Sequence, residues 1–194
     1  MKTQSSESHE GDARVSDLAT HAHGALVEVL GIGVLLLGPS GIGKSECALD
    51  LVTRGHALCA DDRVRLARRE DRLEGSAPEV IRYFLEIRGI GLLYLPDLYG
   101  ESAVRETTEV DLVCRLEEWR EGAKFDRIGA ERQREVVGGV SLPVVTLPAR
   151  PAASVATLVE ASVRDHLQRS RGATGAERMN AALRATASGG SRGE

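Results

Sequence analysis

Short apolar runs and amphipathic stretches alternate along this chain, and together they predict a mixed α/β fold. The run 34–37 consists only of Val and Leu, as in a strand that is buried on both faces. A second apolar run, 25–30, precedes it, and only Gly31-Ile32-Gly33 lies between the two. A parallel crossover needs a dozen or more residues, so these strands are expected to be antiparallel neighbours in a mixed sheet.

The same patterns predict the other elements. Helices are expected at 44–54, where Gly55 is a natural stop, at 79–85 after Pro78, and at 154–168. Strands are expected at 56–60, 107–116 and 140–147, with a hairpin formed by 63–69 and 72–74. Pro143 interrupts the strand at 140–147, which is therefore expected at a sheet edge.

The length of 194 residues suits one well-buried domain. Residues 1–17 are rich in Ser, Glu and Asp and lack hydrophobic periodicity, which predicts a disordered leader. The folded domain is expected at 18–170. Residues 171–194 are rich in Ala, Gly and Ser, and a flexible tail or a frayed helix is expected there.

Composition excludes several classes of function. A net charge of −4 and few aromatic residues argue against nucleic-acid binding, and Trp119 is expected in core or interface packing rather than base stacking. Since no apolar run reaches about 18 residues, no membrane span is expected. The three cysteines are scattered, without a C-x-x-C pair, as in a chain from a reducing compartment. The expected location is the cytoplasm.

The candidate chemistry centres on a G-x-x-x-x-G-K-S motif between the strand at 34–37 and the helix at 44–54. This context is the one that a phosphate-binding loop requires, because the backbone N–H groups and the helix N-terminus converge on an anion. The Lys44 ammonium is expected to reach the terminal phosphates, and the Ser45 hydroxyl to ligate Mg²⁺. The nucleotide-binding residues are expected to be Gly38, Pro39, Ser40, Gly41, Ile42, Gly43, Lys44 and Ser45.

Two later segments carry further charged candidates. Asp61 and Asp62 end the strand at 56–60, where they suit a Mg²⁺- or water-handling position; a strand-terminating turn is the alternative. Adjacent residues on an extended segment point to opposite sides, so only one of the two is expected to face the site. Glu86 and Arg88 stand next to Gly89 and indicate either close approach to a ligand or a salt-bridged turn.

These motifs occur in one order along the chain. They are His23-Gly24, Gly38–Ser45 followed by Glu46, Ala60-Asp61-Asp62, Leu85-Glu86-Ile87-Arg88-Gly89-Ile90-Gly91 and Phe125-Asp126-Arg127-Ile128-Gly129. The series resembles the catalytic domain of HPr kinase/phosphorylase, the bacterial enzyme that phosphorylates a regulatory serine of the phosphocarrier protein HPr. The resemblance covers roughly residues 22–163 and implies a P-loop domain on a mixed sheet, similar to the phosphoenolpyruvate carboxykinase-like nucleotide core.

The resemblance also implies roles for particular residues. His23, Lys44, Asp62 and Arg127 would be catalytic, with Asp62 as the general base toward the acceptor serine. Ser45 and Glu86 would hold Mg²⁺, with Asp61 and Arg88 in support. The implied cofactors are ATP and Mg²⁺, the implied partner is HPr or an HPr-like phosphocarrier, and the implied assembly is a homo-oligomer, a hexamer in the family.

The chain departs from the family pattern in two places. About twenty residues precede the motif series, so a short form without the amino-terminal domain of bifunctional members is expected. Residues 148–154 read P-A-R-P-A-A-S where bifunctional enzymes have a segment resembling P-x-x-P-G-R-N, so loss of the phosphorylase activity is expected. Two other functions stay open from the residues: a non-catalytic nucleotide sensor and a small-molecule kinase. A GTPase is disfavoured because no N-K-x-D motif occurs.

Overall fold

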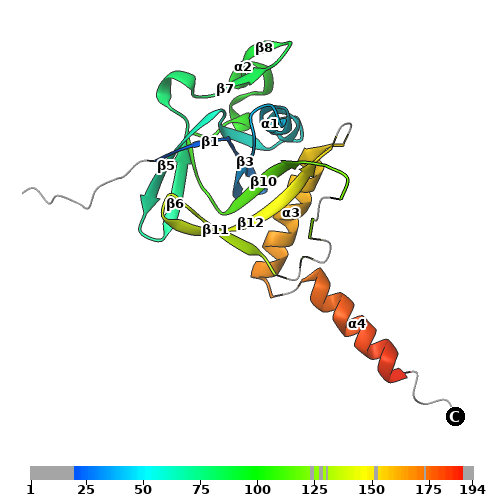
Figure 1. Cartoon of the computed structure of the whole chain (residues 1–194). Helices are drawn as coiled ribbons and strands as arrows, with labels where there is room; N and C mark the ends of the chain where they lie inside the picture. Colours follow the sequence, from blue (N-terminus) through cyan, green and yellow to red (C-terminus); the bar gives the residue numbers. More distant parts are fainter. Residues whose placement is uncertain are drawn as a thin grey trace, which may run out of the picture.

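The chain combines short strands and helices in one mixed α/β arrangement (Figure 1). The computed structural model describes residues 20–122, 125–126, 129, 131–150, 153–172 and 174–189. The strands are β1 (Thr20–His23), β2 (Ala25–Val29), β3 (Ile32–Leu37), β4 (Ala57–Ala60), β5 (Arg63–Arg69), β6 (Arg72–Ser76), β7 (Phe84–Ile87), β8 (Gly91–Tyr94), β9 (Thr107–Glu109), β10 (Leu112–Glu118), β11 (Gln133–Val137) and β12 (Val140–Ala149). The helices are α1 (Lys44–Thr53), α2 (Leu95–Tyr99), α3 (Val155–Ser170) and α4 (Gly175–Gly189), with 3₁₀ turns η1 (Glu79–Ile81) and η2 (Glu101–Ala103).

A six-stranded sheet in the order β11-β12-β10-β3-β2-β4 is the centre of the fold. Strand β10 runs parallel to both β12 and β3, whereas the other neighbours are antiparallel. The expected antiparallel pairing of β2 with β3, and with it the mixed sheet, is confirmed. A four-stranded antiparallel sheet, β1-β5-β6-β9, and the two-stranded sheet β7-β8 complete the fold.

Both faces of the central sheet are buried, and each face packs on a different layer. Val34 and Leu36 of β3 point to one face and pack with α1 and α3, while Leu35 points to the other. On that second face the partners are Val64 and Leu66 of the four-stranded sheet. This alternation explains why the run at 34–37 is apolar at every position: each successive side chain enters a different core.

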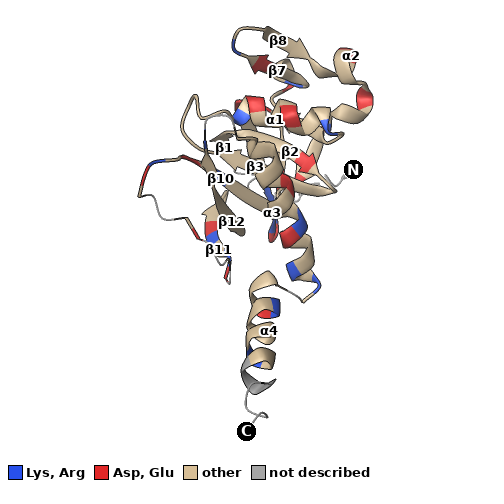
Figure 2. Cartoon of the chain, turned by 90° about the vertical axis from the view of Figure 1, so that its right-hand side faces the viewer, with Lys and Arg blue, Asp and Glu red and all other residues tan. Residues whose placement is uncertain are grey.

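Helices α1 and α3 lie side by side and are joined by a charged network (Figure 2). Arg54 donates hydrogen bonds to the Asp50 carboxylate, to Glu160 Oε2 and to Ser154 Oγ, and the shortest nitrogen–oxygen distance to each of the three is 2.9 Å. The hydrogen bond from Arg54 lowers the pKa of Asp50, and the contact with His56 lowers the pKa of Glu160. The network therefore fixes the start of α3, where Ser154 is the N-cap, against α1.

Three predicted elements were wrong. No helix forms at 79–85: η1 is a single turn and Phe84–Ile87 is strand β7. The strand expected at 107–116 is split into β9 and β10, which belong to different sheets. Strand β12 is not at an edge, because β11 and β10 flank it. Its parallel pairing with β10 begins at Val144, so Pro143 lies before the residues that pair with β10.

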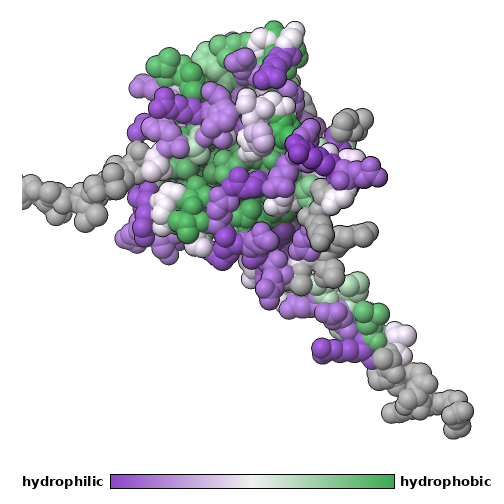
Figure 3. Space-filling model, in the orientation of Figure 1, coloured by the Kyte–Doolittle hydropathy of each residue, from purple (hydrophilic) through white to green (hydrophobic). Residues whose placement is uncertain are grey.

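Two features project from the layered core. Exposed apolar residues gather over η1, the β7–β8 hairpin and α2, at the top of the molecule in Figure 3. They are Val80, Ile81, Ile90, Leu92, Tyr94, Leu98 and Tyr99.

Helix α4 extends away from the remainder of the fold (Figure 1). Residues 175–189 of the expected tail are therefore helical. The leader at 1–17 and residues 190–194 lie outside the described residues, and within those described no helix could cross a membrane.

The β9–β10 connection passes directly against Gly33, which makes this position sensitive to substitution. The N–H of Gly33 donates to Asp111 Oδ2 at 2.9 Å, and a Cβ at Gly33 would lie 1.7 Å from the carbonyl oxygen of Glu109. We expect Gly33→Ala to lower the free energy of unfolding by about 3 kcal/mol, because backbone must move to admit the methyl group. Urea denaturation followed by circular dichroism measures this change.

Gly175→Ala is the matched control for that substitution. A Cβ at Gly175 meets no atom within 4 Å. We therefore expect the free energy of unfolding of the Gly175→Ala variant to stay within about 0.5 kcal/mol of the value for the unsubstituted protein. Equal stabilities of the two variants would contradict the close packing of the 109–111 connection on β3.

Candidate active site

The predicted phosphate loop connects β3 to α1 and has the backbone conformation that its glycines allow. Gly41 and Gly43 adopt φ values of 80° and 98°, in the left-handed region that side chains with a Cβ rarely occupy. Gly43 is also the N-cap of α1, so the first N–H groups of the helix face the loop. The loop therefore presents backbone donors and the positive end of a helix dipole to the same space.

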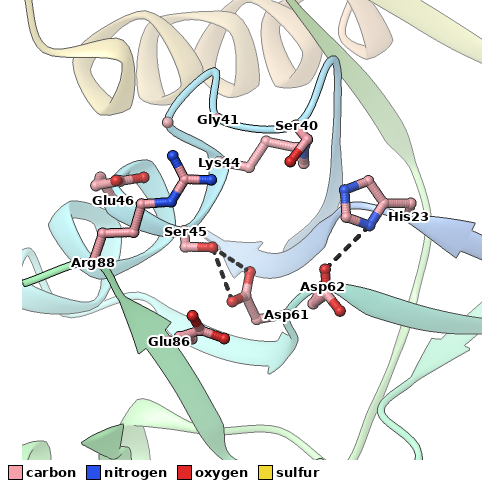
Figure 4. A pocket seen from close by; sticks show the side chains of 11 residues that line it. His23, Ser40, Gly41, Lys44, Ser45, Glu46, Asp61, Asp62, Glu86 and Arg88 are labelled. Atoms are coloured by element: carbon pink, nitrogen blue, oxygen red, sulfur yellow. Dashed lines mark hydrogen bonds and ion pairs between the residues drawn. The ribbon is translucent and has the colours of Figure 1, made fainter. Parts of the chain in front are cut away.

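Lys44 and Ser45 lie at the start of α1 and point into a cavity of about 210 Å³ (Figure 4). The Nζ of Lys44 donates to the carbonyl oxygens of Gly38 and Pro39, both at 2.9 Å. This side chain is only 7% exposed, and burial lowers its pKa, although the nearby carboxylates of Asp61 and Asp62 act in the opposite direction. The ammonium thus lies inside the loop, where it is held by carbonyl groups of the loop itself.

Both carboxylates at the end of β4 line this cavity, contrary to the expectation that only one would face it. The reason is the backbone of Asp62, whose φ of 62° ends the extended conformation on which the alternation rule depends. A three-residue turn results, in which the N–H of Arg63 donates to the carbonyl of Asp61 at 2.7 Å. A left-handed non-glycine residue is uncommon and is often found at functional sites.

The two carboxylates have different surroundings. Asp61 is 7% exposed and accepts the Ser45 hydroxyl at 3.0 and 2.9 Å on its two oxygens. Burial raises the pKa of Asp61, and the hydrogen bond from Ser45 opposes that change. The Asp62 side chain is 74% exposed and lies 3.1 Å from Nδ1 of His23. Asp61 is thus coupled to the loop, whereas Asp62 faces solvent and has an imidazole as its partner.

Strand β7 brings Glu86 to the same cavity, and the turn after it brings Arg88. The alternation of β7 buries Leu85 and Ile87 in the core and leaves Glu86 on the cavity side. Arg88 reaches toward Gly41, and its guanidinium lies 3.4 Å from the position that a Cβ there would take. Among the described residues neither Glu86 nor Arg88 forms an ion pair, so the alternative of a salt-bridged turn is wrong within that part of the chain.

The oxygen groups in this cavity match the ligands that Mg²⁺ takes. Ser45, Asp61 and Glu86 supply a hydroxyl and two carboxylates, all hard oxygen donors. Over the ranges that the structure describes, no three His, Cys, Asp or Glu side chains are placed to hold a metal ion by themselves. The hydroxyl of Ser45 with the carboxylates of Asp61 and Glu86 fits Mg²⁺, which is bound through one or two carboxylates together with substrate phosphates and water.

The structure brings together most of the residues expected at the site. One cavity is lined by His23, Ser40, Gly41, Gly43, Lys44, Ser45, Asp61, Asp62, Glu86 and Arg88. Gly38 and Pro39 contact Lys44, while Ile42 faces a second cavity. Arg127 lies outside the described residues.

Sequence reasoning missed several residues near the loop. Glu46, in the first turn of α1, lines the cavity; the motif series includes it, but no role at the site was predicted for it. Trp119 and Arg150 line the second cavity. Trp119 is 41% exposed, so of the two expected positions, the core or an interface, the core is wrong. No local pattern indicated that β10 and β12 place these two residues beside the loop.

Comparisons with known proteins agree with this geometry. The family model described as HPr Serine kinase C-terminal domain matches residues 16–183. The HPr kinase/phosphorylase of Caldanaerobacter subterraneus subsp. tengcongensis is 51% identical over 162 residues, which make up 83% of this chain and 53% of that protein. The HPr kinase/phosphorylase of Geobacter sulfurreducens is 44% identical over 154 residues, 79% of this chain and 48% of that protein. The chain spans about half the length of the curated relatives it matches.

A solved structure is similar as well. The structure of the Hpr(Ser) kinase/phosphatase from Coxiella burnetii superposes with a TM-score of 0.72 at 32% sequence identity. The match covers 79% of this chain and 99% of the chain in that structure.

Proposed function

We propose, since this chain belongs to the family of HPr Serine kinase C-terminal domains, that it is an ATP- and Mg²⁺-dependent protein serine kinase that phosphorylates HPr. One observation carries the proposal. The phosphate loop, the buried Asp61 and Asp62, whose side chain is 74% exposed, converge on one cavity. We place the kinase domain at residues 18–170.

The loop would bind the ATP phosphates through its backbone N–H groups and Lys44. The ammonium of Lys44 would exchange the carbonyl groups of Gly38 and Pro39, both at 2.9 Å, for oxygens of the β- and γ-phosphates. A lysine that is desolvated before the nucleotide arrives loses little hydration on binding, so its attraction for phosphate is not offset by a large desolvation cost. Arg88, across from Gly41, is suited to hold a phosphate oxygen.

Mg²⁺, when bound, would neutralise charge on the β- and γ-phosphates. Ser45 and Glu86 would hold it, as the family resemblance implies. The hydrogen bonds from the Ser45 hydroxyl, at the start of α1, to the Asp61 carboxylate, at the end of β4, add Asp61 to this group, because the two side chains are already in contact. The second of the paired aspartates is thereby left available for the acceptor.

Asp62 would act as the general base. Its carboxylate would take the proton of the acceptor serine hydroxyl while the serine oxygen bonds to the γ-phosphorus and the bond to the ADP oxygen breaks. Nδ1 of His23, 3.1 Å away, would hold the Asp62 carboxylate in position. Arg127, as a residue of the Phe125–Gly129 motif, would stabilise charge on the transferred group.

The proposals on phosphorylase activity, oligomeric state and location rest on the family resemblance and on exposed apolar residues. The absence of the P-G-R-N sequence from 148–154 supports a kinase with little phosphorylase activity. We propose a homo-oligomer, with the hexamer implied by the family resemblance alone. The exposed apolar residues over the β7–β8 hairpin and α2 support an interface between proteins, since patches of this kind mark such contacts. A cytoplasmic location would put the chain in the compartment of its acceptor.

The test is transfer of γ-labelled phosphate from ATP to purified HPr in the presence of Mg²⁺. We expect label on HPr and none on an HPr variant whose regulatory serine is replaced by alanine. ATP binding without label on HPr would reject the proposal. That result would favour a nucleotide sensor, which binds ATP but transfers nothing to a protein.

A further inference from the structure

A row of exposed basic side chains lies next to the cavity, on the outer face of the four-stranded sheet. Strands β1 and β5 are antiparallel neighbours there, and their register places His23 opposite Arg63 and His21 opposite Arg65. These four side chains are exposed, whereas Val64, between the two arginines, is turned to the core. His21, Arg63 and Arg65 therefore continue the surface that His23 begins at the cavity, and we call these three residues the basic strip.

The basic strip lacks the acidic partners that the far end of the same sheet supplies. There, Arg72 donates to Glu109 Oε2 at 3.2 Å. Over the ranges that the structure describes, neither Arg63 nor Arg65 forms an ion pair or a side-chain hydrogen bond. Two guanidinium groups on one face of a strand, roughly 7 Å apart, repel each other unless an anion lies between them. The end of the sheet beside the cavity is therefore stabilised by an anionic partner.

The basic strip starts at the residue proposed to receive the acceptor serine. Arg63 follows Asp62 directly, and Asp62 lies against His23 (Figure 4). The N–H of Gly24 donates to the carbonyl of Asp62 at 3.2 Å, which ties the end of β1 to the start of β5. Neither Arg63 nor Arg65 lines the cavity itself. They are thus placed to contact a molecule that extends beyond the cavity, as a protein does when one of its serines reaches Asp62.

Carboxylates of an extended protein segment match the basic strip in spacing and in charge. Side chains two residues apart on such a segment lie on one face, with the same separation as Arg63 and Arg65. The guanidinium group binds a carboxylate through two parallel hydrogen bonds. The chain as a whole has a net charge of −4, so an acidic partner is attracted only where positive charge is gathered.

We propose that the basic strip docks an acidic segment of the acceptor protein, with carboxylates of that segment paired to Arg63 and Arg65 while the acceptor serine lies at Asp62. This inference rests on the proposed function and adds to it the chemistry of the acceptor beside the phosphorylated serine. Arg65 is the residue to substitute, because it lies outside the turn that positions Asp62.

The test is the dependence of phosphoryl transfer on the concentration of HPr, at saturating Mg²⁺–ATP. We expect Arg65→Thr to raise the KM for HPr about fivefold and Arg65→Glu about twentyfold, with kcat and the KM for ATP within about twofold of the unsubstituted protein. Threonine is well suited to strands, so β5 is expected to persist. Added salt is expected to raise the KM for HPr of the unsubstituted protein more than that of Arg65→Glu.

Arg72→Thr is the matched control, because it removes the same charge from the same sheet at a position that already has an acidic partner. We expect its KM for HPr to stay within about twofold of the unsubstituted value. An equal rise in Arg72→Thr and Arg65→Thr would show an effect of net charge alone and would contradict a docking surface.

Poly-L-glutamate gives a second readout on the unsubstituted protein. We expect it to inhibit transfer in competition with HPr and not with ATP, and to inhibit Arg65→Glu less. Competition with ATP alone would mean that the anion site belongs to the nucleotide.

Three results would overturn the inference. An unchanged KM for HPr in Arg65→Glu would place the acceptor elsewhere while leaving the proposed function intact. A higher KM for ATP with an unchanged KM for HPr would assign Arg65 to the nucleotide. A lower KM for HPr would mean that an acidic segment of this chain occupies the strip. If the unsubstituted protein transfers no phosphate to HPr, the proposed function fails and the inference with it.

Discussion

Asp62→Asn is expected to lower the rate of phosphoryl transfer to HPr by about 10²- to 10⁴-fold, the usual contribution of a general base. Asparagine has the shape of aspartate but cannot accept the proton of the serine hydroxyl. It also tolerates the left-handed conformation that position 62 requires, at φ 62°, so the turn between β4 and β5 is expected to persist. The measurement is transfer of γ-labelled phosphate to HPr at saturating ATP.

The affinity for ATP distinguishes loss of the base from damage to the loop. The Asp62 side chain is largely exposed and lies against His23, not against the phosphate loop, so we expect ATP binding to be retained. Asp71→Asn makes the same chemical change in the exposed turn between β5 and β6, and transfer by this control is expected to equal that of the unsubstituted protein. Transfer by Asp62→Asn at an undiminished rate would remove Asp62 from the mechanism.

Lys44→Ala is expected to reduce transfer by about 10³-fold or more and to weaken ATP binding, since a buried ammonium beside the γ-phosphate stabilises both the bound nucleotide and the transition state. Stability is not expected to fall in parallel. The lowered pKa of Lys44 means that the fold disfavours its charge, so removing the ammonium relieves a desolvation cost.

Lys44→Arg is the informative companion variant. It retains the positive charge, but a planar guanidinium does not fit where a compact ammonium contacts two carbonyl oxygens at 2.9 Å. We therefore expect it to transfer phosphate poorly as well, with a melting temperature below that of Lys44→Ala. If both variants retained transfer, Lys44 would have no role at the γ-phosphate.

Local sequence signals were sufficient for the loop and its two flanking elements. The Val34–Leu37 run, the glycines and the amphipathic stretch after Lys44 each act within a few residues of chain, so strand, turn and helix could be predicted together. The same holds for the β5–β6 hairpin and for α3, where Ser154 is the cap. Local position also indicated the candidates Asp61, Asp62 and Glu86, to which the motif order gave roles, and all three line the same cavity.

Long-range packing decided what the local patterns could not. Phe84 and Leu85 were predicted as the end of the helix at 79–85, because the apolar residues of that segment have helical spacing. Pairing with β8 instead makes Phe84–Ile87 a strand, and the alternation of that strand directs Glu86 to the cavity. The segment 107–116 has continuous alternation, yet contacts with β6 and β3 divide it between two sheets. In both places hydrogen bonds to distant residues outweigh a weak local preference.

The sequence by itself determined the phosphate loop, the elements around it and the family, because each depends on neighbouring residues or on an ordered set of motifs. Only the tertiary structure decided that Asp61 and Asp62 share one cavity and that Trp119 and Arg150 stand beside the loop. The first depends on one backbone dihedral at Asp62, and the second on the register of two parallel strands. Neither is encoded in a local pattern of apolar and polar residues, since both arise when segments far apart in the chain pack together.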